Sequence, residues 1–217
     1  MGGCLTLQYK NIIDISPTIS ERLAVFPGDE PFSRNESCKL TDGAPYTLSA
    51  ITTTLHIGSH ADAPSHYALN GESIAERNLE IYLGKCQVIR VVKHPHDQRI
   101  RPSDIADRTI LAPRVLFATE SYQAETWTDT FTSLSPDLIE FLHERNVILV
   151  GIDTPSVDPA ASKKLEAHAA LHRCNVSVLE GLVLRHVDEG LYDLIALPLK
   201  IENGESSPVR AILLSIE

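Results

Sequence analysis

Three histidines and an aspartate lie within eleven consecutive positions of the chain. They are His56, His60, Asp62 and His66, in the stretch LHIGSHADAPSHYALNG. A glycine and a proline interrupt this stretch, so a regular helix cannot run through it. A loop that leaves a strand can still bring such side chains to one point. His56, His60 and Asp62 offer two imidazoles and a carboxylate, a set suited to zinc or a similar divalent ion with a position open for water.

A single histidine in such a loop is most simply explained as a solvated or hydrogen-bonded polar side chain. The crowding of four titratable groups before an Ala-Pro turn has no comparable packing explanation. We therefore predict a metal site here. The same residues could instead form a catalytic base with helper groups, and the local pattern does not separate the two readings.

A lone carboxylate interrupts a strand-like apolar segment much later in the chain. Glu180 lies in VSVLEGLVL, and strand alternation puts it on one face with Val176, Val178 and Leu182. If that face is buried, the carboxylate requires a cation, because an unpaired buried charge costs many kcal/mol. An exposed face or an ion pair with an arginine would explain Glu180 equally well.

Two further histidines, His168 and His172, are one helical turn apart. They do not form the H-E-x-x-H pattern, so a metalloprotease is not indicated. Either of them could face solvent. The absence of G-x-G-x-x-G and P-loop patterns weakens a nucleotide-binding interpretation as well.

Composition restricts the classes of function. The chain has 217 residues, 43% of them hydrophobic, and a formal charge of −10, which argues against a nucleic-acid partner. It has no apolar run of about 18 residues, so we expect no membrane span. The cysteines have no C-x-x-C spacing and are expected to be reduced thiols in a cytoplasmic protein; they are Cys4, Cys38, Cys86 and Cys174.

The pattern of elements predicts a mixed α/β fold in which strands outnumber helices. We expect Ser135 to cap a helix that begins at Pro136, and Asp158 to cap a helix of about four turns that begins at Pro159. No linker or repeat divides the chain, so residues 1–217 are expected to form one domain. Strands are predicted in NIIDISPTI, Thr47–His56, YLGKCQVIRVV, PRVLFAT, VILVGID, NVSVLEGLVL, YDLIALPLK and PVRAILLSI.

Motifs spread through most of the chain resemble the cyclase-like family of metal-dependent amidohydrolases, and within it the bacterial kynurenine formamidases. They are DISPTI, FPGDEPF, HIGSHADAPSHY, GIDTPSVDP, AHAALHRCNVSVLEGLVL, LIALPLK and SPVRA. The resemblance implies a single domain with a barrel-like β core flanked by helices. It also implies a homodimer, because members of the family are usually homodimers or larger.

The resemblance further implies two metal ions per subunit, usually zinc, with manganese or another divalent ion as the alternative. It assigns five ligands: His56, His60 and Asp62 for the first ion, Asp62 and Glu180 as bridges, and His168 for the second ion. His66 matches the position of the general acid/base histidine. These roles rest on the resemblance, and not on the spacing of the residues.

The activity implied by the resemblance is hydrolysis of N-formyl-L-kynurenine to L-kynurenine and formate, a step in tryptophan degradation. Phe26 stands where the formamidases commonly carry tryptophan, so it offers an aryl substrate an aromatic face without an indole N–H. The alternatives are a related hydrolase that opens a cyclic amide such as isatin, and a non-catalytic protein in which zinc joins loops. The roles of four residues stay open: Asp153, Asp158, His172 and Arg210.

Overall fold

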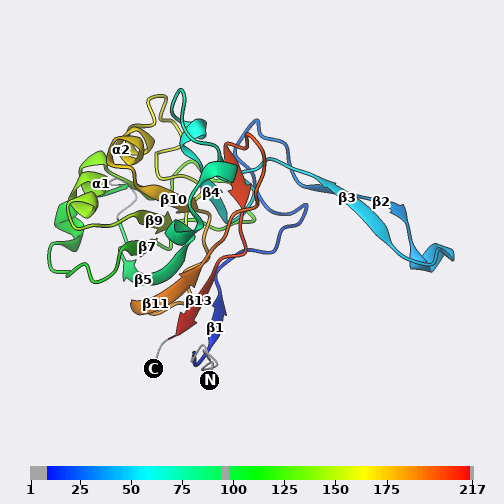
Figure 1. Ribbon diagram of the computed structural model, residues 1–217, viewed down its shortest axis with the longest axis horizontal. Coiled ribbons are helices and arrows are strands. Elements are labelled where there is room, and N and C mark those ends of the chain that lie inside the picture. Colours follow the sequence, from blue (N-terminus) through cyan, green and yellow to red (C-terminus); the bar gives the residue numbers. More distant parts are fainter. Residues whose placement is uncertain (1–8, 94–97, 216–217) are drawn as a thin grey trace, which may run out of the picture.

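A curled sheet of nine strands forms the centre of the computed structural model, which describes residues 9–93 and 98–215 (Figure 1). In order across the sheet, its strands are β1 (Ile12–Asp14), β13 (Ile212–Ser215), β11 (Gly190–Ile195), β5 (Leu83–Arg90), β7 (Arg114–Ala118), β9 (Leu149–Ile152), β10 (Ser177–Glu180), β4 (His60–Asp62) and β12 (Ser206–Pro208). The four strands from β5 to β10 run parallel to one another, and all other pairings in this sheet are antiparallel. The predicted mixed, barrel-like α/β class is confirmed.

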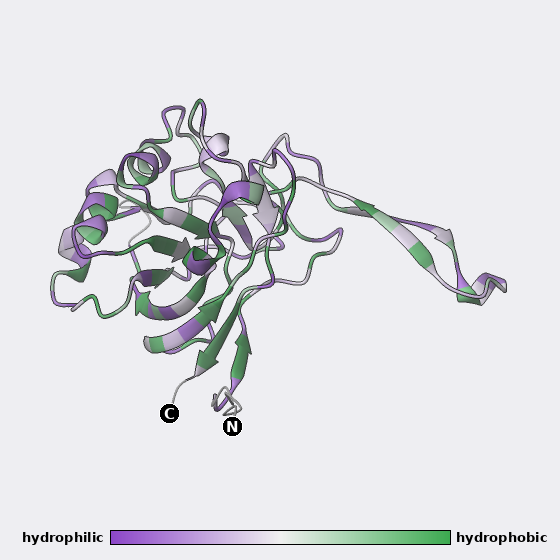
Figure 2. Ribbon diagram, in the orientation of Figure 1, coloured by the Kyte–Doolittle hydropathy of each residue, from purple (hydrophilic) through white to green (hydrophobic). Residues whose placement is uncertain are grey.

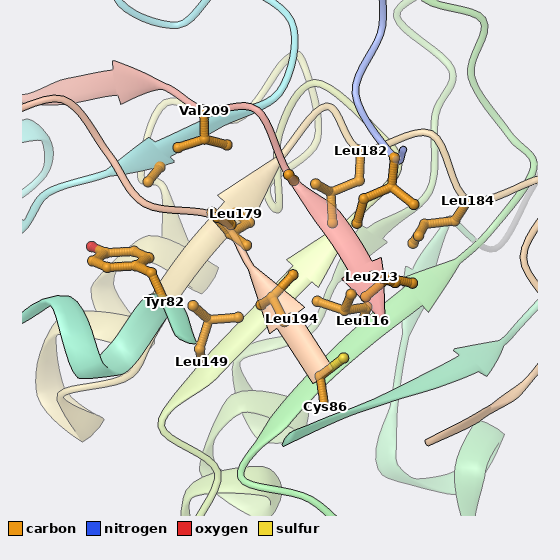
Figure 3. Packing of buried hydrophobic residues seen from close by; sticks show 14 of the residues in the cluster. Tyr82, Cys86, Leu116, Leu149, Leu179, Leu182, Leu184, Leu194, Val209 and Leu213 are labelled. Atoms are coloured by element: carbon orange, nitrogen blue, oxygen red, sulfur yellow. The ribbon is translucent and has the colours of Figure 1, made fainter. Parts of the chain in front are cut away.

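Both faces of the central strands are buried, which explains why β9 is an uninterrupted apolar run. In β7, Val115 and Phe117 point toward two helices, α1 (Pro136–His143) and α2 (Glu166–Cys174). Alternate residues of these strands, together with residues of β11 and β13, fill the inside of the curled sheet (Figure 3), among them Cys86, Leu116, Leu149, Leu194 and Leu213. The helices therefore cover one face of the sheet, and the sheet itself encloses the other.

Helix α1 begins as predicted. The Ser135 hydroxyl accepts a hydrogen bond from the Leu138 N–H at 3.2 Å, and Pro136 occupies the first turn.

The prediction of a long second helix from Pro159 was wrong. Helix α2 begins only at Glu166, after a loop whose last residue, Leu165, has a left-handed φ of 46°. Asp158 still caps this helix, but it does so from across the loop. Its carboxylate accepts the N–H groups of Ala167 and His168 at 3.0 and 3.1 Å. The cap residue was identified correctly, and the position of the helix was not.

Short elements complete the fold. Five 3₁₀ turns occur among the described residues, at Leu40–Asp42, Pro64–His66, Ile74–Glu76, Leu79–Tyr82 and Pro102–Ile105. Two additional small sheets pair β6 (Arg99–Ile100) with β8 (Ser133–Leu134), and β2 (Ser33–Cys38) with β3 (Leu48–Thr52). The predicted strand at Thr47–His56 is thus shorter than expected, and β2 and β4 were not predicted.

The β2–β3 hairpin projects away from the rest of the molecule (Figure 1). We call residues 33–52 the arm. Its strands form a separate two-stranded sheet, which does not join the nine-stranded one.

The cysteines that the structure describes are free thiols, as predicted. Cys86 is buried, and this burial raises the pKa of its thiol to about 12. Cys4 lies outside the described residues. Across residues 9–93 and 98–215, no helix has both the length and the apolar character needed to cross a lipid bilayer.

Gly181 should be the glycine least tolerant of substitution near β10. Its φ is 65°, and an added Cβ would overlap the backbone carbonyl of Gly58. We expect Gly181→Ala to lower the free energy of unfolding by about 3 kcal/mol, from backbone strain and overpacking together. Urea denaturation measures this loss.

Gly28→Ala is the control, because Gly28 also has a positive φ but open space around it. It should cost about 1 kcal/mol, from strain alone. Equal losses in the two variants would contradict the close approach of Gly181 to Gly58.

Candidate metal centre

The pairing of β10 with β4 brings three of the predicted ligands to one face of the sheet. In this antiparallel ladder Glu180 lies opposite His60, and Val178 lies opposite Asp62. Paired residues, and residues two apart along a strand, point to the same side. Val178 belongs to the cluster packed against the helices, so His60, Asp62 and Glu180 also face the helical layer. The predicted face is therefore real for Val176, Val178 and Glu180, and it is buried. It does not extend to Leu182, because β10 ends at Glu180 and Leu182 packs inside the curled sheet.

Helix α2 brings His168 to the same place. The His168 Nε2 lies 3.4 Å from Oδ2 of Asp62 and 3.5 Å from Oε1 of Glu180. From the opposite side, the His60 Nε2 lies 3.3 Å from Oε2 of Glu180 and 3.6 Å from Oδ1 of Asp62. All four side chains are buried. Residues more than a hundred positions apart thus form one compact cluster.

His56 and His66 lie next to this cluster and are less buried than its four members, so they mark its open side. The His56 Nδ1 lies 3.0 Å from Oδ1 of Asp62, and the rings of His56 and His66 are 4.4 Å apart. Two groups of side chains could each hold an ion, one made of His56, Asp62 and His66, the other of His60, Asp62 and Glu180. Asp62 is common to both groups. His66 lies where it could serve either as a ligand or as a proton carrier.

The unsatisfied atoms of the cluster fit a metal ion. The Nε2 atoms of His60 and His168 and both carboxylate oxygens of Asp62 are buried and make no hydrogen bond with acceptable geometry. Leaving such atoms unpaired costs about 1–3 kcal/mol each. Imidazole nitrogens with carboxylate oxygens are a donor set that zinc and related divalent ions accept. The residues present therefore match a metal centre.

Neighbouring groups orient the two buried imidazoles. The Nδ1 of His60 lies 2.9 Å from the Gly58 carbonyl oxygen, to which it can only donate. The Nδ1 of His168 lies 2.8 Å from Oδ2 of Asp158. Each contact keeps a proton on Nδ1 and directs Nε2 into the cluster, where it is the nitrogen that could bind an ion. Asp158 is fully buried and so has two roles, as cap of α2 and as the group that orients His168.

The sequence pointed only to the capping role of Asp158. Its contact with His168 required knowledge of the loop between them. The backbone of this loop also contributes, because the Val157 N–H donates to Oε1 of Glu180 at 2.7 Å.

Charges within the cluster compensate one another. Burial opposes protonation of His60, but the carboxylates of Glu180 and Asp62 outweigh it and raise the pKa of His60 to about 9. Burial also opposes ionisation of Asp62, and the contacts from His168 and His56 nevertheless hold its pKa well below the usual range. Desolvation lowers the pKa of His66, and the carboxylate of Asp62 only partly offsets this. The side chain of His66 is more exposed than those of His56, His60 and His168, so among these histidines it is the one most open to a ligand.

A cleft of about 970 Å³ opens over the cluster. Phe26, the predicted substrate-binding residue, lies in its wall with 39% of its surface exposed. The Phe26 ring packs edge-on against Trp127, with the ring centroids 4.9 Å apart. The cleft therefore joins the polar cluster to an aromatic wall, an arrangement that suits an aryl substrate.

Asp153 supports another part of this wall. Its buried carboxylate accepts hydrogen bonds from the N–H groups of Thr119 and Glu120, at 2.9 and 3.0 Å, and from the Thr119 hydroxyl at 2.6 Å. These bonds hold a turn in which Glu120 has a left-handed φ of 57°. The turn leads to Tyr122, which also lines the cleft. Asp153 thus shapes the cleft without joining the metal cluster.

The other two residues with open roles lie apart from the centre. The Arg210 guanidinium forms an exposed ion pair with Asp14, with Nε 2.9 Å from Oδ2. His172 is exposed on α2, while His168 on the same helix is buried in the cluster.

Comparisons with known proteins identify the family and the fold of this chain. The family described as "Putative cyclase" matches residues 13–159. The kynurenine formamidase of Bordetella pertussis is 45% identical over 206 residues, which are 94% of this chain and 98% of that protein. The kynurenine formamidase of Polaromonas naphthalenivorans is 45% identical over 203 residues, 93% of this chain and 90% of that protein.

Solved structures with the same fold include a potential metal-dependent hydrolase with cyclase activity. It has a TM-score of 0.82 and 27% identity, over 95% of this chain and 98% of that one. Isatin hydrolase A from Labrenzia aggregata has a TM-score of 0.80 and 28% identity, over 95% and 94%. This chain belongs to the cyclase family and, within it, to the branch of the kynurenine formamidases.

Proposed function

We propose that this protein hydrolyses the formamide bond of N-formyl-L-kynurenine to give L-kynurenine and formate. The observation that carries the proposal is the buried cluster of His60, Asp62, His168 and Glu180 at the base of a cleft with an aromatic wall. The 45% identity with kynurenine formamidases, over nearly the whole chain, supports the choice of substrate.

The metal content is part of the proposal. We expect two divalent ions per chain, zinc first, held by His56, His60, Asp62, His168 and Glu180, with manganese as the alternative. A divalent ion in such a site supplies Lewis acidity, which lowers the pKa of water and polarises a carbonyl group. Asp158 and the Gly58 carbonyl keep the two buried imidazoles in the tautomer that can bind it.

We propose that His66 moves the proton. It faces the cleft next to His56 and is the least buried histidine of the cluster. In the proposed reaction it takes a proton from the attacking water as oxygen adds to the formyl carbon. It then delivers that proton to the aniline nitrogen as the C–N bond breaks. The products are formate and the free arylamine, so the atoms balance.

Phe26 would orient the substrate. It lines the cleft and gives the aryl ring an apolar surface to pack on, while Trp127 packs edge-on against it, and ring packing of this kind contributes about 0.5–1.5 kcal/mol beyond area burial. Trp127 carries an indole N–H that Phe26 lacks, but it donates to Asp129 at 2.6 Å and is not directed at the substrate.

Opening of a cyclic amide such as isatin is the second candidate. Similarity to isatin hydrolase A, at 28% identity, favours it, but the formamidases are considerably closer in sequence. For the assembly and location of the enzyme we propose a homodimer in the cytoplasm.

Turnover of the purified protein tests the proposed function directly. We expect metal-loaded protein to release L-kynurenine from N-formyl-L-kynurenine, followed by absorbance, and to act on isatin far more slowly. Metal per chain is measured on the same sample. Protein with its full metal content and no hydrolysis of N-formyl-L-kynurenine would exclude the function.

His66→Ala should abolish most turnover without removing metal. Loss of a general acid/base lowers kcat by about 10²–10⁴-fold. His172→Ala is the matched control, because it removes an exposed histidine outside the cluster and should change neither rate nor metal content. If His66→Ala loses an ion, His66 is a ligand and the assigned proton transfer is wrong.

Asp158→Asn should weaken metal binding although Asp158 is not among the proposed ligands. The substitution removes the charge that orients His168, and loss of such a partner costs about 10–100-fold in affinity. Competition with a chromogenic chelator gives the affinity, and circular dichroism checks that α2 persists.

Asp158 also lies 3.7 Å from Arg99, which pairs with Glu166 at 2.9 Å. Glu166→Gln, which perturbs that exposed pair alone, therefore serves as the control. Unchanged affinity in Asp158→Asn would refute the orienting role.

A further inference from the structure

Arg185 brings a positive charge to the cleft over the metal cluster. Among the described residues it is the only lysine or arginine that lines this cleft, whereas six carboxylate residues do so. These six are Asp29, Glu120, Glu125, Asp153, Glu180 and Glu205. Except for Glu180, all the charged residues of the cleft lie in loops and turns, outside the central strands whose apolar character Figure 2 shows. The lining of the cleft is therefore acidic, and Arg185 is the exception.

The charge of Arg185 is not used within the chain. Glu120 forms an ion pair with Arg90, which does not line the cleft. Glu125 pairs in the same way with Arg22, at 3.5 Å. The guanidinium of Arg185, in contrast, forms no ion pair or hydrogen bond with any residue that the structure describes. It is therefore available for an anion, and its planar fork matches a carboxylate through two parallel hydrogen bonds.

The backbone holds Arg185 in place. It lies in a turn between Leu184 and Val187, which are both buried, and the Val187 N–H donates to the Leu184 carbonyl at 3.0 Å. The neighbouring His186 places its Nε2 3.1 Å from the Asp14 carbonyl oxygen. The turn is thus fixed on both sides, while Arg185 itself is exposed. Its side chain can bind a ligand without breaking an internal contact.

One continuous segment joins Arg185 to the metal cluster. Glu180 and the five residues that follow it all line the cleft. Five residues extend at most about 18 Å. Between the two charged ends the segment is apolar, with Leu182, Val183 and Leu184. This side of the cleft therefore fits a ligand with a reacting group at the metal cluster, an apolar middle and an anionic end.

N-formyl-L-kynurenine has its groups in this order. Its formamide is attached to an aryl ring, and a short chain from the same ring carries an α-amino acid. The carboxylate of that amino acid would be repelled by the acidic lining unless a cation receives it, whereas the α-ammonium would be attracted. The amino acid has no net charge, so its carboxylate is recognised by a short-range contact and not by the overall field of the cleft. Isatin offers neither charge.

We propose that Arg185 binds the α-carboxylate of N-formyl-L-kynurenine and so selects amino-acid formamides over amides that lack a carboxylate. This inference rests on the proposed function and names a determinant of its specificity. Arg185 has no part in breaking the C–N bond. The contact is the same in the bound substrate and in the transition state, so its loss raises KM and leaves kcat unchanged.

Two substrates of the metal-loaded protein test this role. They are N-formyl-L-kynurenine and 2-formamidoacetophenone, which has the same formamide and aryl ketone but no amino acid. In Arg185→Gln we expect the KM for N-formyl-L-kynurenine to rise about 5–10-fold, as for one charged contact at an exposed site. The KM for 2-formamidoacetophenone should not change. Arg185→Lys keeps the charge without the planar fork and should give an intermediate KM.

Arg22→Gln is the matched control, because it removes the same charge from a residue that pairs with Glu125 but does not line the cleft. It should change the KM for neither substrate. The proposal is overturned if Arg185→Gln raises both KM values equally, if it leaves the KM for N-formyl-L-kynurenine unchanged, or if the control has the same effect.

Binding of the products gives a second measurement that needs no turnover. In calorimetric titrations Arg185→Gln should bind L-kynurenine about 5–10-fold more weakly than the wild type does, with unchanged affinity for 2-aminoacetophenone. Equal weakening for both ligands, or no detectable binding of L-kynurenine by the wild type, would contradict the role of Arg185. A wild type that hydrolyses neither formamide would instead refute the proposed function, and the two affinities would still show whether Arg185 recognises the carboxylate.

Discussion

The antiparallel pairing of β4 with β10 is the contact on which the centre depends. Because His60 lies opposite Glu180, one ladder fixes two of the proposed ligands, and alternation adds Asp62 on the same face. If β4 slipped by one residue along β10, His60 and Asp62 would turn into the apolar interior of the curled sheet, away from Glu180. Gly181, directly after Glu180, allows a close approach to the Gly58 carbonyl at the end of this ladder.

Burial of these groups is costly, and the surrounding structure shows how the cost is met. Two carboxylates and two imidazoles lie together with almost no access to solvent. The carboxylates stabilise positive charge at this position, which is why the pKa of His60 is raised despite burial. Outer contacts from Asp158, Gly58 and Val157 hold the side chains in place before any ion arrives. The polar cluster is thus preorganised for a cation, and hydrophobic packing on both sheet faces supports it.

Most residues of the centre could be predicted from their types and local pattern. The strand, helix start and loop contact that bring them together could not. Crowded histidines and a charged residue in an apolar strand are local signals, and the structure brings all of them together. The resemblance, not the spacing, selected His168 over His172, and their burial agrees with that choice. Strand β4 was missed because it is only three residues long, polar at both ends and flanked by turns. The start of α2 was misjudged because capping by Asp158 acts across a loop, and no local rule encodes such a contact.

The proposed ligands also differ in how firmly the fold holds them. His60, Asp62 and Glu180 are fixed by backbone ladders, and His168 by a capped helix. His56 and His66 belong to turns on the open side, where the support comes from Thr54 and a short 3₁₀ turn. The rigid half suits permanent binding of an ion, whereas the open half borders the substrate cleft. Local stability is lowest where contacts are few, so the open half is the less firmly held part of the centre.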